Sequence, residues 1–391
     1  MSREATQVRT DARARGRARV LILSFSPIVS DARVLKQVRL LAADHDVTTC
    51  GYGPAPEGVV DHVEVPADRP AWSWSRAALL TRRYRRAYWG NPAVAFARGA
   101  LADRRFDVVL ADDVDTVGLA MWLEPRCGVH ADLHEYAPRQ KEDLLRWRLF
   151  VAPFVRWVCR RFVARARSWT TVGEGIAAEY ERRFGFRPRV VTNATPYTDL
   201  APVPTGRTVR LVHSGAALAD RHLETLVDAV ATSRAAVTLD LYLTPNDPAH
   251  LADLRERAAA HPGRVTVREP VPYDALVATL HRYDVGVMVL APVTFNYRWA
   301  LPNKVFDYVQ ARLGLIVGPS PEMARLVREA GVGAVTEDFS LEALVRALDA
   351  LDPATVDGWK QASADRAHEL SSESQVVVWA EAIDRLLDRP V

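Results

Sequence analysis

The sequence predicts an α/β protein built from two doubly wound domains in tandem. Three observations lead to this fold class. The chain has 391 residues, which is enough for two domains of ordinary size. In both halves, short apolar runs rich in Val, Leu and Ile alternate with stretches of helical periodicity. A segment rich in Pro and turn-forming residues, 195–206, lies between the two halves and predicts a linker.

The N-terminal half begins with a strand–helix–strand unit. Residues 20–24 form an apolar run typical of a buried strand. Asp31 follows as the predicted N-cap of a helix over 32–43, where apolar residues recur at helical spacing. A second strand is predicted at 46–50. Further elements are strands at 107–110, 128–133 and 169–172, and a helix at 175–184; residues 189–191 follow and precede Asn193.

The C-terminal half repeats this alternation. Strands are predicted at 209–213, 237–243, 265–267, 285–290 and 315–317, with helices at 223–231, 249–260 and 275–282. A last helix is expected over 376–387. We therefore expect a disordered basic tail at 1–19, an N-terminal domain at 20–200, a C-terminal domain at 207–372 and a final helical segment at 373–391.

Composition excludes several classes of protein. Hydrophobic residues make up 49% and charged residues 25% of the chain, and the net charge is only +3, as in ordinary globular proteins. The basic start lacks the apolar core of a signal peptide, and no run of 18 apolar residues predicts a membrane span. Cys50, Cys127 and Cys159 lack metal-type spacing, so we expect reduced thiols in a cytoplasmic protein. No nucleic-acid partner is expected.

The most informative stretch of the chain is 301–318. Pro302 suits the first turn of a helix, and Val305, Phe306 and Val309 then share one helical face. Lys304 and Asp307 lie three residues apart near the start of this helix. Because a helix N-terminus offers free N–H groups and a partial positive charge, it suits a diphosphate, and the carboxylate can accept sugar hydroxyls.

This stretch resembles the donor-binding motif of retaining GT-B glycosyltransferases, especially glycosyltransferase family 4. The family pattern is Pro-Asn-Lys-x-Phe-Glu-Tyr-x-Ala-x-Gly, and the matching residues are Pro302, Asn303, Lys304, Phe306 and Tyr308. Asp307 replaces Glu, Arg312 replaces Gly, and Gly314 replaces a following Pro. The resemblance implies the GT-B fold, with two Rossmann-like domains facing a cleft and the final helix returning to the N-terminal domain.

The resemblance also implies a donor site in the C-terminal domain. Ser214 and Gly215 follow a strand, and Arg221 stands where the family has a basic residue that holds the donor diphosphate together with Lys304. Asp307 would bind the nucleotide ribose, and Asn303 and Asn296 complete the donor-binding set. Many family-4 enzymes carry a first Glu that is separated from the second by seven intervening residues, and Trp299 occupies that position here.

Two N-terminal motifs resemble acceptor-side motifs of the same family. One is Asp-Leu-His134-Glu135, whose His lies near the reacting sugar in relatives, so His134 joins Arg221 and Lys304 as a candidate catalytic residue. The alternative is a His that only satisfies a loop. The other is Asp31-Ala-Arg33, for which an acceptor role and a capping Asp beside a solvated Arg are both open.

The resemblance implies transfer of a sugar from a nucleotide diphosphate sugar to a hydroxyl acceptor, a hexosyltransferase-type reaction. We expect retention of configuration, with the leaving diphosphate accepting the acceptor's proton. No metal and no cofactor are expected, since Asp113 and Asp115, although spaced as Asp-x-Asp, follow an N-terminal strand and are interpreted as a loop or acceptor feature. A GT-B-type nucleotide-sugar epimerase and a catalytically decayed sugar-binding protein remain alternatives.

Two stretches, 72–89 and 146–169, mix arginines with aromatic residues. In the second, Leu149, Phe154, Trp157 and Val158 predict a helix with an apolar face and a basic margin. Such a helix either lies in an anionic membrane interface or packs on its own domain. The first case suits a lipid-linked acceptor in surface polysaccharide or glycolipid assembly at the inner face of the cell membrane. The second suits a small soluble acceptor, as in natural-product glycosylation.

Overall fold

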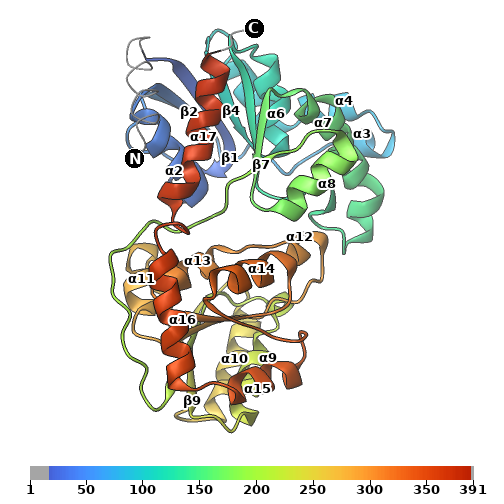
Figure 1. Ribbon diagram of the computed structural model, residues 1–391. Coiled ribbons are helices and arrows are strands. Elements are labelled where there is room, and N and C mark those ends of the chain that lie inside the picture. Colours follow the sequence, from blue (N-terminus) through green and yellow to red (C-terminus); the bar gives the residue numbers. More distant parts are fainter. Residues whose placement is uncertain (1–16, 389–391) are drawn as a thin grey trace. The chain divides into compact units, whose positions relative to one another are not determined.

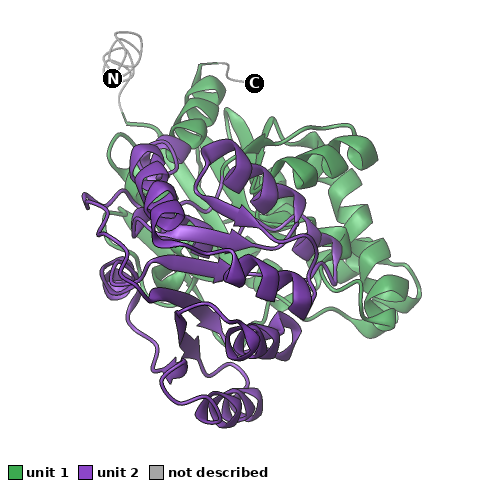
Figure 2. Ribbon diagram, turned by 60° about the horizontal axis from the view of Figure 1, so that its bottom comes forward, with its two compact units in different colours: residues 1–191, 376–391 green, residues 192–375 purple. Residues whose placement is uncertain are grey.

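The computed structural model describes residues 17–388, and the chain divides into two compact units. Unit 1 comprises residues 1–191 and 376–391, and unit 2 comprises residues 192–375 (Figure 2). Most of the predicted basic tail, residues 1–16, lies outside the described residues. Its last residues are ordered, since Arg17 pairs with Asp46 at 2.7 Å and Arg19 begins the first strand. In the described part, no helix combines the length and apolarity that a membrane crossing requires.

Unit 1 contains a seven-stranded sheet in which all strands run parallel. The strand order is β3-β2-β1-β4-β5-β6-β7. Figure 1 labels β1, β2, β4 and β7 of this sheet. The strands are β1 (Arg19–Pro27), β2 (Asp46–Tyr52), β3 (Asp61–Val65), β4 (Val108–Asp112), β5 (Gly128–Leu133), β6 (Ser168–Thr171) and β7 (Arg189–Val190). This order reverses direction between β1 and β4, as in a Rossmann-like sheet.

Helices cover this sheet and close its core. They are α2 (Ala32–Ala42), α3 (Arg76–Leu80), α4 (Tyr84–Trp89), α5 (Pro92–Ala100), α6 (Asp113–Trp122), α7 (Ala152–Arg161), α8 (Glu174–Phe184) and α17 (Ser372–Leu387). The short turns η1 (Ile28–Ser30), η2 (Ala137–Arg139), η3 (Trp147–Val151) and η4 (Val163–Arg165) lie between them. Ile383 and Leu386 of α17 share a buried cluster with Val34 and Val38 of α2, so the end of the chain belongs to this core.

Unit 2 contains a second all-parallel sheet, of six strands in the order β10-β9-β8-β11-β12-β13. Its strands are β8 (Val209–Ala216), β9 (Val237–Thr244), β10 (Val265–Arg268), β11 (Val285–Met288), β12 (Gly314–Val317) and β13 (Gly333–Val335). Its helices are η5 (Ala219–Arg221), α9 (Leu223–Thr232), α10 (Pro248–Ala259), α11 (Tyr273–Leu280), α12 (Phe295–Arg298), α13 (Asn303–Gln310), α14 (Pro321–Ala330), α15 (Leu341–Asp349) and α16 (Pro353–Arg366).

The two faces of the unit 2 sheet carry separate hydrophobic clusters. Leu211 and Val287 face one cluster, which includes residues of α9, α10 and α15. Val212 and Met288 face the other, which includes residues of α13 and α14. Neighbouring residues of a strand point to opposite faces, so helices on both sides are what continuous apolar strands require. The predicted fold class, two Rossmann-like doubly wound units, is confirmed.

The Pro-rich segment 195–206 belongs to unit 2, since the boundary between the units falls at residue 192. Arg312 ties this segment down: its guanidinium donates to the carbonyls of Thr198 at 2.5 Å and Leu200 at 3.0 Å. Arg312 is buried and has a left-handed backbone with φ 61°, which accounts for Gly at the matching position of the family motif. The strain is offset by hydrogen bonds that a glycine cannot make.

The predicted amphipathic helix is α7, and its apolar face lies inside unit 1. Phe154 and Val158 are each only 1% exposed. The packed interpretation is therefore the correct one for this face, because a bilayer has no access to it. Leu149 is different: it lies ahead of α7 in η3 and is 57% exposed.

Candidate active site

Helix α13 carries the motif that the sequence singles out. It begins at Asn303, with Pro302 as its extended N-cap residue rather than within the first turn. Its apolar side packs on the sheet, with Val305, Phe306 and Val309 each at most 1% exposed. This packing fixes the start of α13 beside the ends of the strands, and Lys304, the second residue of the helix, extends from there.

Lys304 is a nearly buried cation. Burial lowers the pKa of its ammonium, the charge of Arg221 lowers it further, and Asp307 raises it. Within residues 17–388 no hydrogen bond or ion pair to this ammonium is found. Gly215 makes room for it, because a Cβ at that position would lie 2.3 Å from Lys304 Cε. Gly215, which the sequence places in the donor site, therefore leaves space for the lysine side chain.

Arg221 ends the short turn η5, ahead of α9. Its guanidinium lies 5.1 Å from the centre of the Tyr297 ring, and the Tyr297 hydroxyl donates to Asp220 at 2.7 Å. Asp220 is 4.0 Å from the Arg221 Nε, and that buried Nε has no hydrogen-bond partner in the described chain. An aromatic ring therefore positions Arg221 while its donors stay available.

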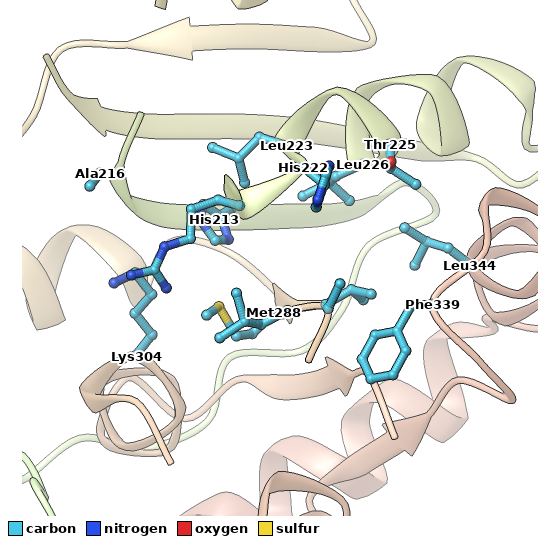
Figure 3. A pocket seen from close by; sticks show the side chains of 14 residues that line it. His213, Ala216, His222, Leu223, Thr225, Leu226, Met288, Lys304, Phe339 and Leu344 are labelled. Carbon is cyan, nitrogen blue, oxygen red and sulfur yellow. The ribbon is translucent and has the colours of Figure 1, made fainter. Parts of the chain in front are cut away.

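Lys304 and Arg221 line one pocket of about 320 Å³ in unit 2, and Figure 3 shows Lys304 and His213 at the same end of it, away from Phe339 and Leu344. The pocket opens at the carboxyl ends of β8 and β11, where the strand order reverses and where doubly wound folds bind ligands. Its remaining lining includes Ala216, His222, Leu223, Thr225, Leu226, Met288, Val289, Leu290, Ala291, Phe339 and Leu344. Cations at one end and apolar residues along the walls suit an anion attached to a flat apolar group.

His213 is a pocket residue that the predicted site residues omit. Its Nδ1 donates to the Val287 carbonyl at 2.8 Å, because that oxygen can only accept. Burial lowers the pKa of His213 to about 4, and the charges of Lys304 and Arg221 also lower it. A neutral imidazole with a free Nε2 lone pair follows. His213 directly precedes Ser214 in the predicted motif. This position is the sequence feature that could have identified His213 as a site residue.

The remaining predicted donor residues do not line this pocket. Ser214 uses its backbone N–H to donate to the Tyr308 hydroxyl at 3.3 Å. Asn303 is the first residue of α13, and Asn296 lies in α12. Asp307 is 3% exposed and accepts a 2.5 Å hydrogen bond from the Thr195 hydroxyl. Trp299, at the position of the first family Glu, is the C-cap residue of α12 and supplies no carboxylate.

In unit 1, His134 follows β5 and is surrounded by carboxylates. Its Nε2 lies 3.1 Å from Asp112 Oδ1 and 3.5 Å from Asp132 Oδ2, and its Nδ1 lies 3.3 Å from Asp113 Oδ2. Burial lowers the pKa of His134, but the three carboxylates outweigh it and hold the pKa well above its ordinary value. Burial raises the pKa of Asp112 to about 7. His134 is therefore a cation held by its own protein.

Asp113 and Asp115, which the sequence places in a loop, belong to the first turn of α6. Asp113 has a left-handed backbone with φ 62°, and its Oδ1 accepts the His134 backbone N–H at 3.1 Å. Such strain persists where the surroundings dictate the conformation. Burial raises the pKa of Asp115 to about 7. Neither residue is a free loop carboxylate.

Arg33 is buried rather than solvated, which corrects one of the two sequence-based interpretations. Its guanidinium donates to both carboxylate oxygens of Asp132 at 2.7 Å and to the Val191 carbonyl at 2.9 Å, and it lies over the Trp379 ring. Asp31 caps α2, accepting from the N–H groups of Arg33 and Val34.

Asp112, Asp132 and His134 offer ligand atoms within 4.8 Å of one another, a spacing that suits a metal ion. Arg33 and Gln37, however, already donate to Asp132, so a divalent ion would have to displace an internal cation. Glu135 faces elsewhere: it accepts a hydrogen bond from Gln140, and burial raises its pKa to about 7.

No protein-family model matches this sequence, and no curated protein matches it. Solved structures do resemble it. HepE of Anabaena in complex with UDP and glucose is 11% identical, with a TM-score of 0.68 over 94% of this chain and 100% of HepE. Sucrose-phosphate synthase of Thermosynechococcus elongatus is 13% identical, with a TM-score of 0.70 over 95% and 100% of the two chains.

WaaG, a glycosyltransferase involved in lipopolysaccharide biosynthesis, is 14% identical, with a TM-score of 0.60 over 92% of this chain and 99% of WaaG. These likenesses extend over both units. At such identities they carry the fold alone, and they confirm the predicted GT-B fold.

Proposed function

We propose that this protein is a glycosyltransferase that moves a sugar from a nucleotide diphosphate sugar to a hydroxyl acceptor. The observation that carries the proposal is the pair of cations, Lys304 and Arg221, that line one pocket at the switch point of the unit 2 sheet. A diphosphate supplies the charge that this pocket lacks. HepE, which shares the fold, has been solved with UDP and with UDP-glucose, and a nucleotide sugar is the ligand we propose here.

The proposed reaction retains anomeric configuration and needs no metal. Lys304 and Arg221 stabilise the negative charge that develops on the diphosphate as the bond to the sugar breaks. The departing diphosphate oxygen then takes the acceptor's proton. His134 cannot take that proton near neutral pH, since the carboxylates around it keep it charged. We assign His134 to hydrogen bonding and charge, not to general base catalysis.

The other residue roles in the proposal follow the motif. Asp307 would bind the ribose hydroxyls, which requires that it exchange or share its present hydrogen bond with Thr195. Asn303 and Asn296 would contact the donor, and Asp31, Arg33 and Glu135 are assigned to the acceptor side. For Arg33 this role acts through Asp132, because its guanidinium is already engaged internally.

We further propose that the protein works in the cytoplasm, at the inner face of the cell membrane, on a lipid-linked acceptor in surface polysaccharide or glycolipid assembly. Its three cysteines are free and buried, which suits a reducing compartment. A natural-product glycosyltransferase with a small soluble acceptor is the alternative, and a missing membrane dependence would favour it.

Incubation with a panel of nucleotide sugars tests the reaction class. A transferase releases nucleoside diphosphate, slowly without acceptor, and each Lys304→Ala or Arg221→Ala variant should lose this release. Conversion of the sugar without release identifies an epimerase. If the sugar nucleotide binds in calorimetry but is neither cleaved nor converted, the protein is a catalytically decayed binding protein.

A further inference from the structure

One surface of unit 1 combines unpaired arginines with exposed apolar side chains. Two hollows lie on it. The first, about 830 Å³, is called the arginine hollow and is lined by Arg82, Arg83, Tyr84, Arg85, Arg86, Trp89, Arg98, Trp122 and Trp157. It contains no acidic residue, and its wall consists of cationic and aromatic side chains only.

The five arginines of this hollow have no carboxylate partner in the part of unit 1 that the structure describes. Some exposed arginines elsewhere in the same unit are neutralised: Arg104 pairs with Asp61, Arg126 with Asp107, and Arg187 with Glu174 and Glu181. Others have no carboxylate partner among the described residues, so it is the clustering of five such arginines in one hollow that distinguishes this surface. An arginine that is merely solvated can lie beside an acidic residue. Solvation alone therefore does not explain why this hollow has no acidic residue. The concentrated, uncompensated charge therefore points to an external anion.

The second hollow, about 500 Å³, is called the leucine hollow. Its wall includes Trp72, Leu80, Leu144 and the aliphatic part of Lys141, whose ammonium lies 5.8 Å from the Trp72 ring centre. Trp72 is 52%, Leu80 61% and Leu144 50% exposed, an unusual density of large apolar groups in contact with water. Trp147 also lines this hollow, and its buried indole N–H has no hydrogen-bond acceptor within the described residues.

The two hollows are parts of one surface. A chain of ring contacts links Trp72 to Trp74, Trp74 to Phe154, and Phe154 to Trp157, which lines the arginine hollow. Helix α3 contacts both α4 and η3, so the backbone elements that carry the hollows pack together. Much of this surface comes from α3, α4 and η3 and the segments beside them, and α7 contributes Trp157. The apolar face of α7 at Phe154 and Val158 is buried and is not part of it.

We propose that this surface docks unit 1 on a bilayer that contains anionic lipids. Arginines would lie at the phosphate groups, tryptophans at headgroup level, and the exposed leucines in the acyl boundary. A nucleic acid would also match the arginines, but it offers nothing to the leucines, so the lipid surface fits better. The evidence for this docking surface does not depend on the proposed function. The proposed function only supplies the reason for docking, which is access to a lipid-linked acceptor.

Co-sedimentation with phosphatidylcholine vesicles, with and without phosphatidylglycerol, tests the proposal. The full chain should bind only the vesicles with phosphatidylglycerol, and salt should weaken binding. The variant R82Q/R83Q/R85Q/R86Q should lose roughly a hundredfold or more in partitioning, because each basic residue near an anionic surface contributes about a fivefold factor.

The matched control R126Q/R182Q/R183Q/R187Q removes the same charge from arginines that are paired with carboxylates, and it should partition as the parent does. A second variant, L80S/L144S/L145S, which also changes the 60% exposed neighbour of Leu144, should bind more weakly too. The control V60S/V293S/V377S, whose residues are similarly exposed, should not. Equal losses in test and control variants would overturn the proposal.

Absence of binding at low salt, or tight binding to an oligonucleotide without vesicle binding, would also overturn it. Nucleoside diphosphate binding, measured in all four variants, should be unchanged. A protein that binds nucleoside diphosphate but no vesicle would leave the proposed transferase activity standing and reject the docking surface alone.

Discussion

Each unit holds cations that are wholly or partly buried, but the two units surround them differently. In unit 2, Lys304 and Arg221 face one pocket with no carboxylate closer than the 4.0 Å contact between Arg221 and Asp220. In unit 1, Arg33 and His134 are enclosed by Asp112, Asp113 and Asp132. A cation whose partners are internal stabilises the fold, whereas one without them destabilises it until an anion binds. The difference separates structural charge from charge kept for a ligand.

The largest effect should come from Arg33→Met. This change leaves Asp132 buried without its main partner, and breaking a buried pair typically lowers the free energy of unfolding by about 3–5 kcal/mol. Chemical denaturation measures it. Arg39→Met, on the exposed side of the same helix, is the control and should change little. A small effect from Arg33→Met would mean that the charge in unit 1 is not structural.

Lys304→Met should show the opposite pattern. Affinity for nucleoside diphosphate should fall by about 1.5–3 kcal/mol, the usual range for hydrogen bonds to charged groups. The melting temperature should not fall, because no internal partner is lost. Calorimetry and thermal denaturation measure the two quantities, with the exposed Arg328→Met as control. Loss of stability with unchanged affinity would place Lys304 in the same class as Arg33 and remove the contrast.

Gly215→Ala tests whether the position of the Lys304 ammonium matters for binding, without removing a charge. The added Cβ would lie 2.3 Å from Lys304 Cε, so the lysine must move away from its position in the pocket. We expect nucleoside diphosphate affinity to fall about tenfold, or roughly 1.4 kcal/mol. Gly358→Ala, where a Cβ meets no neighbour, is the control. Unchanged affinity in Gly215→Ala would show that the position of the ammonium does not matter.

The smallest effect is a pH dependence of stability in unit 1. The pKa of His134 is raised in the folded protein, so its stabilising contribution is complete below the unfolded pKa of about 6.5 and is lost as the pH rises through the folded value. The free energy of unfolding should therefore decrease above about pH 6.5, by at most about 1.4 kcal/mol per pH unit from this group. His134→Gln should flatten that slope. An identical slope in both proteins would contradict the assigned charge of His134.

Helix α13 could be predicted from the sequence alone because the residues that indicate it lie close together in the chain. Pro302, the apolar spacing of Val305, Phe306 and Val309, and the following apolar strand all lie within a short stretch, so the helix start was placed to within one residue. The Asp31 cap was predicted for the same reason and is confirmed. The motif also brought Arg221 and Lys304 into one proposed site, and both line the unit 2 pocket.

Three residues have surroundings or roles that could not be predicted from the sequence: Arg33, Arg312 and Trp299. Whether Arg33 is solvated or buried depends on Asp132, which lies 99 residues away in the chain but one strand away in the sheet. Arg312 departs from the family glycine, and its hydrogen bonds to residues 112 and 114 positions earlier explain how the left-handed backbone is tolerated. For Trp299, the structure gives a place in the fold but no substitute for the missing carboxylate.

By itself, the sequence determined the alternation of strands and helices, the capping residues and the chemical groups available to a site, because these depend on spacing along one short segment. Only the tertiary structure decided which cations are neutralised and which remain free. Pairing depends on groups brought together by the sheet order from positions far apart in the chain, as Asp112 and Asp132 are beside His134. The same holds for the face of α7, since burial is a property of the packed unit and not of a helix alone.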